Sequence, residues 1–201
     1  HEMVVEGIHM HTGSDIMDID VFLQGAEILF EVAAEFKDLE YIDFGSGFKV
    51  PYKEEDIETD IEELGEKIGQ RFKKFTYDYG RSLTLMFEPG KFLVSESGTF
   101  LVKVNVVKQT TSTVFAGVDS GLKTEGRQRV YNIVGYICET DTFGVNRKMT
   151  EINEGDILAF KNAGAYCFTM ASNYNSRYRP AEVLIHEGKD YLIRERETLE
   201  D

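Results

Sequence analysis

The chain has little positive charge and no long apolar run. Its 201 residues include 22 lysines and arginines against 36 aspartates and glutamates, which gives a net charge of −14. Such an acidic excess argues against nucleic acid or an anionic membrane surface as a partner. No apolar run approaches the roughly 18 residues that can cross a bilayer, and no basic-then-apolar leader is visible. The sequence therefore predicts neither a membrane span nor a signal peptide.

Cysteine is scarce as well, since Cys138 and Cys167 are the only two. Their spacing fits neither a metal site nor a disulfide framework, so we expect reduced thiols, a cytoplasmic protein and no metal. The hydrophobic fraction of 42% is sufficient for a buried core in one large or two small domains.

Residues 1–95 alternate between short apolar runs and long helical patterns. Apolar runs end near residues 9, 44 and 87, and amphipathic patterns with a 3.6-residue period cover about 18–36 and 54–79. This alternation predicts parallel strands with helical crossovers, whose polar ends gather on one face. A complete eight-unit barrel takes about 250 residues, or about 31 per unit, so this stretch would hold three units.

From about residue 99 the helical period stops and short β-rich runs follow. We place them at 100–107, 113–118, 129–138, 155–160, 164–170, 181–186 and 190–194. They predict a separate antiparallel sheet domain. The expected domains are therefore 1–95 and 96–201.

Two histidines at alternate positions, His9 and His11, end the first apolar run, and Gly13 and Ser14 follow. A strand, a polar tip and a helix start are the parts of a phosphate site at the carboxyl end of a parallel strand. A metal-binding pair, or two unrelated surface histidines, would give the same spacing.

Three further motifs admit a functional and a structural interpretation. Gly45-Ser46-Gly47 would let backbone N–H groups approach an anion, or would form a plain tight turn. In Glu88-Pro89-Gly90-Lys91 the carboxylate could face a protonated ring nitrogen and the lysine a phosphate, or proline could rigidify a surface turn. Gly164-Ala165-Tyr166 offers a phenol to a phosphate, or an aromatic side chain to a strand.

A fourth motif, Cys138-Glu139-Thr140-Asp141, places a thiol and two carboxylates within four residues. Such groups can transfer protons. A buried cysteine beside a solvated acidic turn is the structural alternative.

Taken in order, these motifs resemble the diaminopimelate decarboxylases, which are barrel-type pyridoxal phosphate enzymes of the alanine-racemase-like class. The resemblance rests on Gly-Ile-His-Met-His-Thr-Gly-Ser, Asp-Phe-Gly-Ser-Gly-Phe, Phe-Glu-Pro-Gly-Lys, Val-Asp-Ser-Gly-Leu, Cys-Glu-Thr-Asp and Gly-Ala-Tyr, which span residues 7 to 180. It implies an α/β plus all-β fold class: the C-terminal portion of a pyridoxal-phosphate-binding TIM barrel, followed by an antiparallel β domain.

The resemblance also implies roles for individual residues. His11 would stack on the ring of pyridoxal 5'-phosphate, Glu88 would pair with its ring nitrogen, and Lys91 stands where many members have arginine. The phosphate would be bound by Ser14, Gly45, Ser46, Gly47 and Tyr166.

Cys138 and Glu139 match a pair that reaches the active site of the other subunit in a homodimer. The cysteine would donate a proton to the carbanion, and the acid would contact the far amino-acid end of the substrate. With His11 they form the expected catalytic set, and the substrate would be a small diamino acid.

Three departures from the family pattern stand out. The Schiff-base lysine lies in the family's N-terminal half, and no lysine of this chain matches it. The segment 122–127 is shorter than the usual Arg-Pro stretch, and Asp141 stands one place earlier than the family's second acid.

We therefore expect the C-terminal part of an enzyme that converts meso-diaminopimelate to L-lysine and carbon dioxide in lysine biosynthesis. These residues alone should be inactive. The alternatives are a related decarboxylase acting on carboxynorspermidine, ornithine or arginine, and a non-catalytic regulator that binds the same cofactor.

Overall fold

The computed structural model describes residues 3–52, 56–119, 128–137 and 141–200. The chain divides into two compact units, residues 1–96 and 97–201. Each unit has its own hydrophobic cluster.

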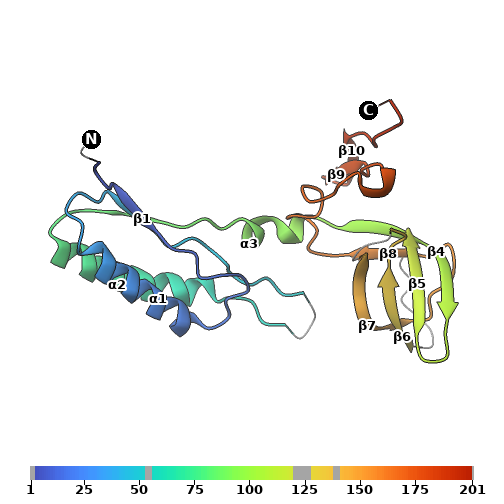
Figure 1. Cartoon of the computed structure of the whole chain (residues 1–201), viewed down its shortest axis with the longest axis horizontal. Helices are drawn as coiled ribbons and strands as arrows, with labels where there is room; N and C mark the ends of the chain where they lie inside the picture. Colours follow the sequence, from blue (N-terminus) through green and yellow to red (C-terminus); the bar gives the residue numbers. More distant parts are fainter. Residues whose placement is uncertain (1–2, 53–55, 120–127, 138–140, 201) are drawn as a thin grey trace. The chain divides into compact units, whose positions relative to one another are not determined.

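The first unit is a three-stranded parallel sheet covered by two helices. Strands β1 (Gly7–His9), β2 (Tyr41–Asp43) and β3 (Thr84–Met86) lie side by side in that order, with His9 opposite Asp43 and Asp43 opposite Met86. Helices α1 (Ile19–Ala33) and α2 (Ile61–Tyr79) connect the strands and lie on one side of the sheet (Figure 1). The predicted order of parallel strands and crossover helices is confirmed.

Short-range signals in the sequence set the helix ends. The Asp18 carboxylate accepts N–H bonds at the start of α1, and the Asp60 carboxylate accepts one from Glu63 at the start of α2. Gly80, at a φ of +76°, ends α2 in the left-handed conformation that only glycine adopts easily.

Helix α2 begins seven residues later than the acidic run at 54 suggested. Thr59 is buried, and its hydroxyl donates to the Ile16 carbonyl while it accepts from the Lys49 N–H. Because these bonds hold Thr59 against residues ten and 43 positions earlier in the chain, residues 56–60 stay non-helical.

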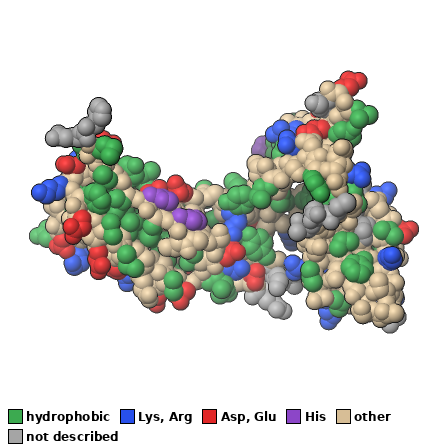
Figure 2. All heavy atoms as spheres, in the orientation of Figure 1, with side chains coloured by type: hydrophobic (Ala, Val, Ile, Leu, Met, Phe, Trp, Pro, Cys, Tyr) green, Lys and Arg blue, Asp and Glu red, His purple; other side chains and the backbone are tan. Residues whose placement is uncertain are grey.

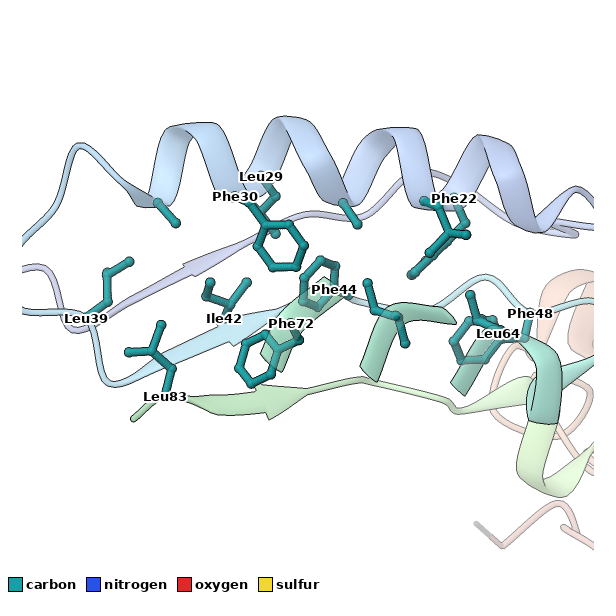
Figure 3. Packing of buried hydrophobic residues seen from close by; sticks show 14 residues of the cluster. Phe22, Leu29, Phe30, Leu39, Ile42, Phe44, Phe48, Leu64, Phe72 and Leu83 are labelled. Atoms are coloured by element: carbon teal, nitrogen blue, oxygen red, sulfur yellow. The ribbon is translucent and has the colours of Figure 1, made fainter. Parts of the chain in front are cut away.

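An aromatic cluster fills the space between sheet and helices (Figure 3). The Phe30 ring of α1 stacks on Phe75 of α2 at 4.8 Å between centroids and meets the edge of Phe44 at 5.5 Å. Ile42 of β2 is fully buried in this layer. Since side chains alternate along a strand, Asp43 points to the opposite face of the sheet.

After β3 come a short helix, α3 (Lys91–Val94), and a 3-10 turn (Ser95–Ser97). The second unit contains a five-stranded sheet in the order β7-β6-β5-β4-β8. Its strands are β4 (Phe100–Gln109), β5 (Val114–Asp119), β6 (Gln128–Val134), β7 (Thr142–Thr150) and β8 (Ile157–Phe160). A separate hairpin follows, made of β9 (Glu182–His186) and β10 (Lys189–Arg194).

The second unit differs from expectation in three respects. Strands β5 and β6 pair in parallel, so the sheet is mixed rather than antiparallel throughout. The sequence patterns did not predict strand β7, because its polar run from Asn146 to Lys148 hides the alternation of apolar and polar residues in this edge strand.

The third difference is that segment 164–170 forms turns instead of a strand. Asn162 and Tyr166 both adopt positive φ, and the Met170 N–H bonds to the Tyr166 carbonyl at 2.8 Å. In the part of the chain that the structure describes, no helix is long and apolar enough to span a membrane.

Candidate active site

The segments that follow the three parallel strands are joined by backbone hydrogen bonds at one edge of the first sheet. The Met10 N–H donates to the Asp43 carbonyl at 3.0 Å, and the Ile16 N–H donates to the Gly47 carbonyl at 2.9 Å. The Glu88 N–H donates to the Gly45 carbonyl at 2.8 Å. The 13–14, 45–47 and 88–91 segments therefore lie together at the carboxyl ends of their strands.

Two glycines make this close approach possible. A Cβ atom on Gly45 would overlap the Met10 carbonyl oxygen, and one on Gly47 would overlap the Gly13 carbonyl oxygen. Gly47 also has a φ of +108°, which L side chains rarely adopt. Both positions thus require glycine for space as well as for conformation.

The joined turns present backbone donors without acceptors. Among the described residues, none accepts a hydrogen bond from the backbone N–H of Ser14, Ser46 or Gly47. The Gly45 N–H differs, because it donates to the buried Asp43 carboxylate at 2.8 Å. Neighbouring N–H groups of this kind form a site for an anion.

Acidic and histidine side chains gather beside these turns. His9 Nε2 lies 3.2 Å from Glu88 Oε2, with side-chain exposures of 48% and 58%. A ring nitrogen of His9 and one carboxylate oxygen each from Asp43 and Glu88 all lie within 4.8 Å of one another. His11 sits next to Gly45, whose added Cβ would be 3.1 Å from its Nδ1. Figure 2 shows the histidine side chains of the first unit beside acidic ones.

Lys91 supplies a cation at the same edge. Its Nζ bonds Asp15 Oδ1 at 2.5 Å and lies 5.4 Å from the centre of the Tyr52 ring. Burial, the largest single influence, lowers the pKa of Lys91, but hydrogen bonds and charge from Asp15 and Tyr52 together raise it above 10.5. Lys91 therefore stays protonated at neutral pH.

The expected site residues of the second unit are described separately. Tyr166 lies in a turn at a φ of +65° with 59% of its surface exposed, so it does not serve as a packed strand aromatic. Cys138 and Glu139 lie outside the residues that the structure describes.

Sequence reasoning considered His9 only together with His11, at a phosphate-type strand tip or as a metal-binding pair, and gave no role to Asp15 or Asp43. The alternation of His9 and His11 was the one available signal, since it places both side chains on the same face of a strand. Nothing in the sequence indicated which acids they would meet.

Two family models match the chain. Residues 1–95 match the pyridoxal binding domain of the pyridoxal-dependent decarboxylases, and residues 122–164 match the C-terminal sheet domain of the same enzymes. The chain belongs to this family of pyridoxal-dependent decarboxylases. The resemblance found in the sequence, its fold class and its cofactor, pyridoxal 5'-phosphate, are thereby confirmed at the level of the family.

Among its relatives are diaminopimelate decarboxylases. That of Methanothermobacter thermautotrophicus is 40% identical over 97% of this chain and 52% of its own length. That of Campylobacter jejuni is 33% identical over 97% of this chain and 53% of its own length. The crystal structure of the Methanocaldococcus jannaschii enzyme in complex with L-lysine has a TM-score of 0.84 at 31% identity, covering 96% of this chain and 50% of that one. The chain spans about half the length of the curated relatives it matches.

The close contact at Gly47 gives a first prediction. We expect Gly47→Ala to separate the 13–14 and 45–47 turns, because the new methyl group overlaps a backbone oxygen that cannot rotate away. Unfolding of the full-length protein in urea should show a larger loss of stability than the roughly 1 kcal/mol typical of an unsuitable glycine replacement. Gly80→Ala is the matched control, with positive φ but no atom within 4 Å of the new Cβ. Equal losses in the two variants would contradict this account.

The Lys91–Asp15 pair gives a second prediction. Asp15→Asn should lower the pKa of Lys91, measured by NMR titration of its Nζ, because it removes the carboxylate that favours the charged form. The raised pKa means that the pair contributes stability below pH 10.5, which is lost as pH rises through the folded-state value. Glu58→Gln, at an exposed acid of a nearby segment, should leave the titration unchanged. A Lys91 titration unmoved by Asp15→Asn would show that Tyr52 alone causes the shift.

Proposed function

We propose that the full-length protein decarboxylates meso-diaminopimelate to L-lysine and carbon dioxide with the help of pyridoxal 5'-phosphate. The observation that carries this proposal is the 40% identity to a diaminopimelate decarboxylase along 97% of the chain. The site at the strand ends supports it independently, because it combines an anion site with a carboxylate and a histidine.

The joined turns fit the phosphate group of the cofactor. The N–H groups of Ser14, Ser46 and Gly47 are the donors in our proposal, and Lys91 adds positive charge beside them. Gly45 contributes differently from its neighbours: its N–H is occupied by Asp43, so its role is to let the chain pass the Met10 carbonyl. The assignment of Tyr166 to the phosphate rests on the family resemblance alone.

Glu88 and His11 fit the cofactor ring. When bound, a pyridoxal cofactor accepts the electron pair left behind by the departing carboxylate, and a protonated ring nitrogen strengthens that capacity. The backbone N–H of Glu88 donates to the Gly45 carbonyl, and from this position the Glu88 carboxylate can pair with such a nitrogen. His11 lies beside Gly45, where its flat ring can cover the cofactor ring.

Cys138 and Glu139 would act on the substrate in a homodimer. A thiol can return a proton to the carbon that lost carbon dioxide, and it must be protonated to do so. A carboxylate at Glu139 suits an ammonium group at the far end of a diamino acid. A C2 dimer presents the same patch twice, so each subunit can complete the site of the other.

The role of Glu88 gives a third prediction. In the full-length protein, Glu88→Gln should lower turnover of meso-diaminopimelate about a hundredfold or more, because a neutral amide cannot balance a pyridinium charge. Cofactor binding should persist, as measured by absorbance after dialysis, since the phosphate site is intact.

Glu66→Gln, at an exposed acid on α2, is the control and should keep normal turnover. Chromatography measures product formation from each candidate substrate. We expect lysine from meso-diaminopimelate and no product from ornithine or arginine. Normal turnover in Glu88→Gln would remove this residue from the mechanism, and preference for another amino acid would refute the proposed substrate.

Sharing of sites between subunits gives a fourth prediction. Two inactive full-length variants are mixed, one lacking the family's cofactor-binding lysine and the other carrying Cys138→Ala. If each site draws these residues from different subunits, a mixed dimer regains one intact site, about half of normal dimer activity. Mass spectrometry verifies that the subunits exchange. If they exchange and no activity returns, either both residues act within one subunit or Cys138 has only a structural role.

A further inference from the structure

His9 has no role in the function proposed so far, yet it contacts the residue on which that function depends. We propose that His9 is a positioning residue, whose imidazole fixes the Glu88 carboxylate in the orientation that faces the cofactor ring. The inference rests on the proposed role of Glu88 and extends it to the end of a second strand.

The backbone of Glu88 is fixed from two directions. Its N–H donates to the Gly45 carbonyl at 2.8 Å, and Pro89 restricts the preceding residue to extended conformations. The side chain has three rotatable bonds and is more than half exposed. Among the described residues, His9 is the one hydrogen-bond partner of its carboxylate. The orientation of the carboxylate therefore depends on His9.

The contact spans the full width of the first sheet. His9 ends β1, and Glu88 follows β3, with β2 between the two strands. Two strand spacings amount to about 10 Å, so the pair forms only because both side chains reach across the middle strand. This contact ties the Glu88 side chain to the end of β1, two residues before His11.

The hydrogen bond leaves Glu88 able to bind a second donor. An ionised carboxylate only accepts hydrogen bonds, so in this inference His9 Nε2 is the donor and Glu88 Oε2 the acceptor. The other oxygen, Oε1, remains for a ring N–H. The contact at Oε2 thus selects the rotamer of Glu88, and Oε1 remains for the cofactor.

Asp43 explains why a donor is required at this position. Its buried carboxylate accepts the Gly45 N–H and lies within 4.8 Å of both His9 and Glu88. Two carboxylates so close repel each other, which would favour rotation of the exposed Glu88 side chain away from the site. The N–H group of His9 opposes that rotation. Asp43 also connects the pair to the turn that carries Gly45.

The test compares three full-length variants in the holoenzyme: His9→Leu, His9→Gln and His9→Leu combined with Glu88→Gln. Leucine removes the donor, whereas the glutamine amide places one near the position of Nε2. We expect His9→Leu to lower kcat about tenfold to a hundredfold, which corresponds to losing a hydrogen bond to a charged group, with little change in KM. His9→Gln should remain within about threefold of the native enzyme, since the donor is retained.

A second readout is independent of turnover. The absorption spectrum of the bound cofactor, followed against pH, responds to the ring nitrogen, so His9→Leu should shift it in the same direction as Glu88→Gln. His186→Leu is the matched control, because this exposed histidine of β9 also lies near a glutamate, with 3.9 Å between His186 Nε2 and Glu187 Oε1. Its replacement should change neither kcat nor the spectrum.

The double variant separates the two proposals. If His9 acts through Glu88, adding His9→Leu to Glu88→Gln should lower kcat by less than about twofold further, because the group being positioned is already altered. Full additivity, or equal losses in the leucine and glutamine variants, would overturn the role of His9 while leaving that of Glu88 intact. Normal activity in Glu88→Gln alone would refute the role of Glu88 instead. Activity lost with a chelator and restored by Zn²⁺ would show a metal centre at these side chains, and would also overturn the inference.

Discussion

The candidate site depends on backbone hydrogen bonds that join the ends of three parallel strands. Each bond runs from a residue beyond one strand to a carbonyl at or beyond the end of a neighbouring strand, so the bonds tie the connecting segments together. Gly45 and Gly47 are essential to this arrangement, because any larger residue would force neighbouring carbonyls apart. Since the N–H donors, the histidines and Glu88 all project from these segments, their mutual positions follow from the same few bonds.

A second constraint is electrostatic. The protein carries a net charge of −14, yet the site we propose for the phosphate has to attract an anion. Backbone N–H groups and Lys91 supply local positive potential, which operates at short range where the overall charge of the protein matters less. The Asp15 carboxylate bonds Lys91 at the edge of this site and helps to raise its pKa. In our proposal Glu88 faces the cofactor ring and Lys91 lies beside the phosphate, so the acid and the cation serve different parts of the cofactor.

Much of the first unit could be predicted from sequence because its signals are local. The 3.6-residue period marked both helices, Gly80 marked the end of α2, and alternation of strands with helices implied parallel pairing. The start of α2 could not be predicted in the same way. Its acidic run at 54–56 suits a helix terminus, but the buried Thr59 bonds to Lys49 and Ile16, which lie ten and 43 positions earlier in the chain. In the second unit, positive φ at Asn162 and Tyr166 interrupts the strand pattern, and segment 164–170 forms turns.

The sequence by itself determined the family, the cofactor and the motifs, because each motif is a short run of residues whose chemistry can be recognised without knowing its neighbours. Only the tertiary structure decided that His9 meets Glu88, that Asp15 meets Lys91, and that Asp43 rather than a ligand occupies the Gly45 N–H. The physical reason is distance along the chain. His9 and Glu88 are separated by 79 positions, and their contact exists only because three strands with a fixed register bring their ends to one edge of the sheet.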